Sequence, residues 1–142
     1  MKGALDAEHA HPSRRLLLAL LTAVLACGES CHRRDAQAVA AVESELALLK
    51  PPVGLSPTDQ RAGLGEMYAE GAQTYCVRDE KTVQTALDSM LREAGWEPVS
   101  TSTTGDATVW TYRKGGGLGS LTLETQPQPC GRRFRVGLAE PL

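Results

Sequence analysis

The sequence predicts an α+β fold, in which an antiparallel sheet of three to five strands packs on one main helix and is preceded by an N-terminal amphipathic helix. Apolar residues recur every three or four positions in two segments and alternate with polar residues in several later ones. The connections between the alternating segments are short and contain glycine, as in the hairpins of an antiparallel sheet. With 142 residues and few aromatic side chains, the chain can form one modest core.

The amphipathic helix is predicted over residues 35–50, with Asp35 as its N-cap and Pro51 at its end. Its apolar side chains follow helical spacing and form one stripe, which consists of Val39, Val42, Leu46 and Leu49. Such a stripe packs on the core of its own domain or docks a partner protein, and both uses stay open. Beyond a proline-rich linker, a short helix is predicted over residues 56–68.

The main helix is predicted between Asp79, as the N-cap, and Gly95, as the left-handed residue after its end. Its apolar face consists of Val83, Ala86, Leu87, Met90, Leu91 and Ala94. A strand over residues 73–77 leads into this helix. Trp96 directly follows Gly95, and a Schellman end would place its ring on Leu91.

Up to four further strands follow, over residues 98–103, 107–114, 118–125 and 132–138. The glycine run 115–117 is read as a hairpin turn, because no helix pattern follows it as in a phosphate-binding loop. Alternation places Leu121 and Leu123 on one face of the sheet and Thr122 on the other. One face is therefore expected to be exposed, and the main helix is expected to cover the other.

The N-terminal segment has the order of an export signal. A polar stretch ends in Arg14 and Arg15, residues 16–26 carry no charge, and the small Ala26 precedes Cys27. An uncleaved membrane span is the alternative, but eleven helical residues cover about 16 Å, against about 30 Å of bilayer hydrocarbon. Export is the better interpretation.

The four residues Val24, Leu25, Ala26 and Cys27 resemble the lipobox of bacterial lipoproteins, and the resemblance covers the signal only. It implies that Cys27 receives a diacylglyceryl thioether, that cleavage falls before Cys27, and that the new amino terminus is acylated. Leu25 is larger than is usual at its position. Because Gly28 follows the cysteine where Asp would signal inner-membrane retention, the implied location is the outer membrane of the bacterial envelope, facing the periplasm.

These signals divide the chain into three segments. The lipoprotein signal peptide occupies residues 1–26, a tether with the amphipathic helix occupies residues 27–57, and the small α+β domain occupies residues 58–142.

A second interpretation of the same region is a small periplasmic c-type haem protein for electron transfer. Cys27, Cys31 and His32 resemble the haem attachment motif, although three residues separate the cysteines where the standard motif has two. Only Met67 or Met90 remains as a second axial ligand. The lipoprotein interpretation is therefore preferred, and no cofactor is expected.

The remaining thiols predict a disulfide. If Cys27 carries lipid, three cysteines are left in an oxidising compartment, and Cys76 and Cys130 lie within the compact domain whereas Cys31 lies near the tether. We therefore pair Cys76 with Cys130 and leave Cys31 as a spare thiol. A zinc site built on Cys27, Cys31 and His32 would instead need one of that pair as its fourth ligand.

Residue types that commonly act in catalysis are scarce in the predicted domain. The only histidine after residue 26 is His32, so a catalytic triad has no base inside the domain. Glu66 and Glu70 lie four residues apart and would share one helix face, where a solvated surface explains them without acid–base catalysis. The sequence predicts a non-enzymatic binding or accessory domain, with no evident small-molecule substrate.

The expected partners are the membrane, through the lipid on Cys27, and a protein of the envelope. The net charge of −2 gives no sign of nucleic-acid binding. Basic residues near the end of the chain predict a patch on the exposed sheet face, which consists of Arg113, Lys114, Arg132, Arg133 and Arg135. Arg113, Arg133 and Arg135, together with the apolar stripe of residues 39–49, are the candidate partner-binding residues.

Overall fold

The computed structural model describes residues 13–124 and 128–142, and their side chains from Cys31 onward. The chain falls into two compact units, residues 1–33 and residues 34–142. Helix α1 (Ser13–Leu48) begins in the first unit and ends in the second. The backbone is helical from residue 13 through residue 27, but residues 1–12 of the predicted signal peptide and the side chain of Cys27 lie outside what is described. Within the described residues, no helix has the length and apolar character needed to cross a membrane.

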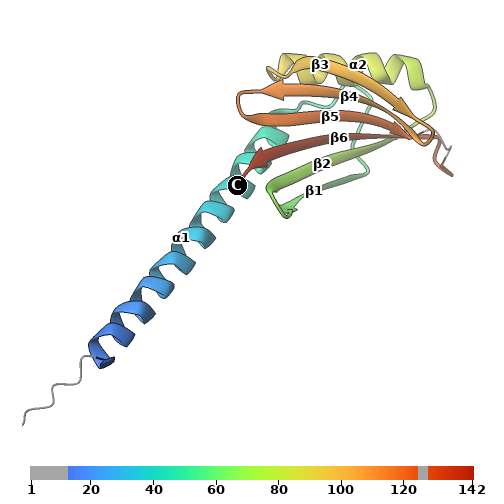
Figure 1. Ribbon diagram of the computed structural model, residues 1–142. Helices are drawn as coiled ribbons and strands as arrows, with labels where there is room; N and C mark the ends of the chain where they lie inside the picture. Colours follow the sequence, from blue (N-terminus) through green and yellow to red (C-terminus); the bar gives the residue numbers. More distant parts are fainter. Residues whose placement is uncertain (1–12, 125–127) are drawn as a thin grey trace, which may run out of the picture. The chain divides into compact units, whose positions relative to one another are not determined.

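The second unit is built on one six-stranded antiparallel sheet, in the order β1-β2-β6-β5-β4-β3 (Figure 1). Its elements are β1 (Asp59–Leu64), β2 (Tyr68–Val77), α2 (Glu80–Glu93), β3 (Glu97–Thr104), β4 (Ala107–Lys114), β5 (Gly117–Glu124) and β6 (Arg132–Pro141). The predicted sheet of three to five strands on one main helix is therefore wrong, because the sheet has six strands and two helices pack on it.

The extra strand is β1, which occupies the range predicted as a short helix over residues 56–68. Gly63 and Gly65 weaken a helix there, and the Gly65 N–H donates to the Tyr68 carbonyl at 2.8 Å to close a turn into β2. β1 then pairs along its whole length with β2, from Asp59 opposite Thr74 onward. The segment is a strand because it pairs with β2, which follows it in the chain. Its own sequence has no alternating pattern that would indicate this pairing.

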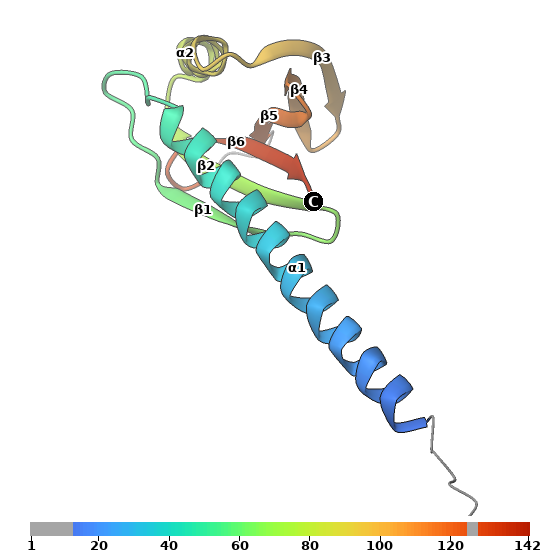
Figure 2. The ribbon, with the colours of Figure 1, turned by 90° about the vertical axis from the view of Figure 1, so that its left-hand side faces the viewer.

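Both helices cover the same face of the sheet. Register partners place Gly71 of β2, Gly119 of β5 and Tyr112 of β4 in one row on that face. Residues 34–48 of α1 lie over Gly71, where an added Cβ would come within 2.5 Å of Val42 Cγ1. At the other side of the row, the Tyr112 hydroxyl donates to Asp88 Oδ1 of α2 at 2.6 Å. The second view shows the sheet bending around the two helices (Figure 2).

The core lies between this face and the helices. It joins the stripe of α1 and the apolar face of α2 to the inward side chains of the sheet, and its largest fully buried members are Trp96, Tyr75, Tyr112, Phe134, Leu46, Leu87, Leu91, Leu121, Val42 and Val136. Among the described residues of the second unit, no helix covers the opposite face of the sheet, as the alternating pattern predicts.

Helix α2 has the predicted ends. The Asp79 side chain accepts from the Thr82 N–H, and its backbone is extended, as at an N-cap. Gly95 has a φ of 90°, and the Trp96 N–H donates to the Leu91 carbonyl at 3.0 Å, which is the long hydrogen bond of a Schellman motif. The motif turns Trp96 back into the core, where it is 1% exposed.

Candidate functional site

The uncovered face of the sheet carries a row of small side chains across five strands. Register partners align Arg61 of β1 with Ala72 of β2, then with Gly137 of β6, Ser120 of β5 and Thr111 of β4. Arg61 ends this row, and the other four positions have side chains no larger than threonine. The row is therefore lower than its neighbours on the sheet surface.

Two adjoining depressions follow this row. One is lined by β1 and β2 with Arg135, and the second, of about 330 Å³, is lined by β2, β6, β5 and β4. Both include Glu70, Gly71 and Arg135. We name the two adjoining depressions together the open-face groove and define it by Arg61, Glu70, Ala72, Leu118, Ser120, Arg135 and Gly137.

Two guanidinium groups line the groove without a carboxylate partner. Within the described part of the chain, neither Arg61 nor Arg135 belongs to an ion pair. Two other basic side chains of the sheet are paired: Lys114 contacts Glu45 at 2.7 Å, and Arg133 contacts Glu124 at 3.4 Å. A free guanidinium offers several N–H donors in a planar fork, which suits a carboxylate.

The predicted basic patch is divided by the fold. Arg113, Arg133 and Arg135 do lie on the uncovered face, but Lys114 points to the helix side, where it reaches Glu45 of α1. Arg132 contacts Glu80 of α2 at 3.3 Å. Register places Arg113 in line with Ala139 of β6, four residues or about 14 Å along the strand from Arg135. The five residues are therefore not one patch.

Arg61 was missed by sequence reasoning. It lies in the segment predicted as a helix, so nothing linked it to Arg135, which is far away in the sequence. Only the pairing of β1 with β2 and of β2 with β6 brings the two side chains to one depression. The sequence pattern pairs Glu70 only with Glu66, on one face of a predicted helix. In the structure Glu66 lies in the β1–β2 turn and Glu70 lies in the groove.

The apolar stripe of residues 39–49, which runs along the end of α1 and one residue beyond it, is packed on the protein's own core. Val42, Leu46 and Leu49 are between 0 and 3% exposed, and Val39 is half-buried against the same core. These side chains cannot contact a partner while the domain is folded. Of the two uses that the sequence left open, the structure shows packing on the chain's own sheet.

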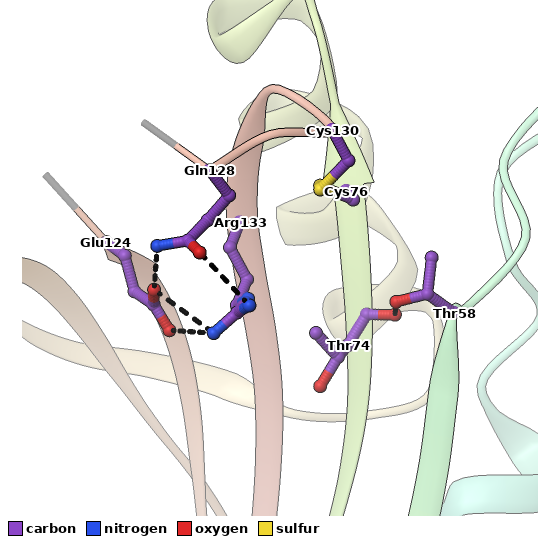
Figure 3. Close-up of a disulfide and its surroundings, with 7 residues drawn as sticks. All are labelled: Thr58, Thr74, Cys76, Glu124, Gln128, Cys130 and Arg133. Atoms are coloured by element: carbon purple, nitrogen blue, oxygen red, sulfur yellow. Dashed lines mark hydrogen bonds and ion pairs between the residues drawn. A yellow bond between two sulfur atoms is a disulfide. The ribbon is translucent and has the colours of Figure 1, made fainter. Parts of the chain in front are cut away.

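The predicted disulfide between Cys76 and Cys130 is confirmed, with the two Cα atoms 5.8 Å apart (Figure 3). It ties β2 to the turn that precedes β6, next to Arg133, which donates to Glu124 and to Gln128 Oε1. Both sulfur atoms are used in this bond, so neither cysteine is available as the fourth ligand of a zinc site.

The two methionines that could serve as the second axial ligand of a haem lie in different surroundings. Met90 is buried in the core, where its sulfur accepts from the Tyr75 hydroxyl at 3.9 Å, whereas Met67 is exposed in the β1–β2 turn. Cys31 and His32 are exposed on α1. Among the side chains described, no three histidine, cysteine or acidic residues cluster as metal ligands would.

Tyr75 and Tyr112, whose pKa values are shifted most, lie on the helix side of the sheet, away from the groove. Burial raises the pKa of Tyr75 to about 12, and burial followed by the hydrogen bond to Asp88 raises the pKa of Tyr112. Burial, with a smaller contribution from Glu45, also raises the pKa of Glu140. These shifts follow from packing in the core, so they do not mark an acid–base site in the groove.

The chain matches no known family model, no curated protein and no solved structure.

Proposed function

We propose that this protein is a bacterial envelope lipoprotein, held in the outer membrane by lipid on Cys27, and that its sheet domain binds an acidic segment of an envelope protein in the open-face groove without catalysing a reaction. The observation that carries the binding role is the pair Arg61 and Arg135. Both line one depression on the face that no helix covers, and neither has a carboxylate partner among the described residues.

The anchoring role rests on the sequence around Cys27. A basic, then uncharged, then small-residue order precedes the cysteine, and the tetrad ending at Cys27 resembles a lipobox. Two or three acyl chains hold a protein on a membrane far more firmly than one, because each buried CH₂ contributes about 0.8 kcal/mol. The groove would then operate at a membrane surface.

Intact mass tests the anchor. The full chain is expressed in a Gram-negative host and extracted from its membranes, and the expected mass is that of residues 27–142 with a diacylglyceryl group and one further acyl chain. The variant Cys27→Ser should lose the lipid, whereas Cys31→Ser, which changes an exposed free thiol four residues away, should keep it. A wild-type mass without lipid, or with residues 1–26 still attached, contradicts the proposal.

The binding role rests on shape and charge together. The floor of the groove is formed by small side chains, so a ligand backbone can approach the sheet closely, and guanidinium groups stand at its β1 and β6 positions. The aromatic side chains Tyr75, Tyr112 and Phe134 all lie in the core on the other side. A chain that bears carboxylates fits these groups, since arginine binds carboxylates with two parallel hydrogen bonds.

Photocrosslinking in cells tests the groove. A photoreactive amino acid replaces Ser120 in the groove or, as a control, the exposed Ser89 on α2. We expect a defined protein adduct from position 120 and none from position 89. Arg135→Glu should abolish the adduct, because it places a negative charge against an acidic partner.

The matched control is Arg78→Glu, which makes the same change of charge at an exposed position outside the groove. It should leave the adduct intact. An adduct that survives Arg135→Glu, or that forms equally from position 89, contradicts binding in the groove.

A further inference from the structure

We propose that the β1–β2 turn, with Leu64 and Met67 at its two sides, rests on the surface of the bilayer that holds the lipid anchor. This inference rests on the anchor at Cys27 in the proposed function, and it assigns a contact that the groove does not use. It is carried by where the exposed apolar side chains lie and by where the chain leading to Cys27 leaves the domain.

Exposed apolar side chains gather at one end of the sheet. Among the described residues, six large hydrophobic side chains are exposed: Leu48, Val53, Leu64, Met67, Val99 and Leu118. Leu64 and Met67 flank the β1–β2 turn, and Leu118 is the second residue of β5, just after the β4–β5 turn. Both turns lie at the same end of the sheet (Figure 1).

The β1–β2 turn presents its apolar side chains from a braced backbone. The Gly65 N–H donates to the Tyr68 carbonyl at 2.8 Å, and the Leu142 N–H donates to the Met67 carbonyl at 3.3 Å. Leu64 is 56% exposed and Met67 is 71% exposed. Contact with a lipid surface removes such side chains from water, and this change is favourable in free energy.

The N-terminal residues of the second unit, which belong to α1, extend away from the sheet at this same end. Residues 34–41 of α1 run out past the end of the sheet that holds the two turns (Figure 1). The ion pair of Glu45 with Lys114, the last residue of β4, fixes α1 there at 2.7 Å. The chain that leads back to Cys27 therefore begins beside the exposed apolar side chains.

The length of the connecting chain keeps this end close to the bilayer. Ala38 is the first residue of α1 that packs on the core, and Cys27 precedes it by eleven residues. Eleven residues span about 16 Å as a helix and no more than about 40 Å when fully extended. A lipid on Cys27 thus holds the turn within reach of the membrane at all times, whereas a soluble partner would have to be recruited.

The charge of the turn selects the type of lipid surface. Glu66 lies exposed between Leu64 and Met67, so a strongly anionic surface would repel the turn. Arg113 of β4, which is the register partner of Leu118 on β5, is exposed as well. A surface of zwitterionic phosphatidylethanolamine offers ammonium and phosphate groups to both, so we assign this surface to the turn.

A fluorescent probe at the turn tests the contact. The lipidated full chain carries Cys31→Ser, which removes the free thiol, and Met67→Cys, which introduces a single new one. The new cysteine is labelled with an environment-sensitive nitrobenzoxadiazole dye. The protein is reconstituted into vesicles of phosphatidylethanolamine with a minor share of phosphatidylglycerol. We expect the emission to move to shorter wavelength and to be quenched by brominated acyl chains. The matched control is Val53→Cys, which labels another exposed apolar position away from the turn and should keep the emission of an aqueous dye.

Each outcome distinguishes this inference from the proposed function. A lipidated protein whose dye at position 67 behaves like the dye at position 53 overturns the membrane contact alone. A shift to shorter wavelength without quenching by brominated lipid indicates burial against protein, such as a second copy, and also overturns it. Absence of the lipid by mass overturns the anchor and this inference together. Raising the share of phosphatidylglycerol should weaken the quenching, because of Glu66.

Discussion

Trp96 lies so close to Gly119 that a Cβ added to that glycine would be 2.9 Å from Cε3 of the indole ring. Gly117, two residues earlier on β5, leaves the same kind of space, since its Cβ would be 3.2 Å from Cη2 of the ring. The ring comes from the residue that follows the C-terminal end of α2, so these two glycines form the surface on which the end of that helix is anchored to the sheet.

Gly119→Ala should therefore destabilise the domain. Small-to-large changes in a packed core cost about 1 to 3 kcal/mol, because side chains or backbone must shift. The free energy of unfolding from urea denaturation measures the effect. Gly116→Ala is the matched control, because nothing lies within 4 Å of its added Cβ, and it should leave stability nearly unchanged. Equal stability of the two variants would show that the ring does not pack on Gly119.

Gly71→Ala should loosen α1 from the sheet. Its added methyl group would come within 2.7 Å of Leu46 Cδ1 and still closer to Val42, both on the buried stripe of the helix. We expect a lower free energy of unfolding and faster proteolysis between residues 34 and 48. Gly63→Ala, on the adjacent strand with open space around it, serves as the control. Unchanged proteolysis of α1 in Gly71→Ala would contradict the packing described here.

Removing the disulfide should cost about 4 kcal/mol in the chain-entropy model, because Cys76 and Cys130 are 54 residues apart and the bond restricts the unfolded chain. The double variant Cys76→Ser with Cys130→Ser measures this as a fall in the free energy of unfolding. Cys31→Ser removes the exposed free thiol instead and should have no effect. A double variant as stable as the wild type would mean that the bond does not form in the native protein.

Because the pKa of Tyr75 is raised in the folded protein, the free energy of unfolding should fall in alkaline solution. Its pKa is about 12 in the folded state against 10.0 for an ordinary tyrosine, because the ring is buried. Above pH 10 the unfolded chain loses this proton first, so the folded state binds more protons and the free energy of unfolding decreases as pH rises. The contribution is fully present below pH 10 and is lost as pH rises towards 12.

Urea denaturation between about pH 8 and pH 11 measures this slope, which is about 1.4 kcal/mol per pH unit for one group that is fully deprotonated only when unfolded. Tyr75→Phe should show a shallower decline, although it also removes the hydrogen bond to Gln73 Oε1 and lowers stability at neutral pH. A decline as steep as in the wild type would show that Tyr75 does not titrate in this way.

Local signals predicted several elements correctly. The N-cap at Asp79, the Schellman end at Gly95 and the bounds of β4 at residues 107–114 were all found in the structure. Each depends on residues that are neighbours along the chain, namely a capping side chain, a left-handed glycine or an alternating pattern. The disulfide followed from elimination among four cysteines. The lipid on Cys27 stays a prediction.

The sequence by itself determined that an amphipathic helix, a well-capped second helix and a one-sided antiparallel sheet would form, because periodicity and caps act over a few residues. Only the tertiary structure decided that residues 59–64 are a strand, that the stripe of α1 is buried, and that Arg61 and Arg135 line one groove. These depend on strand register and on ion pairs between distant residues, such as Lys114 with Glu45. Contacts of this kind form only when segments far apart in the chain meet, and no short stretch of sequence encodes them.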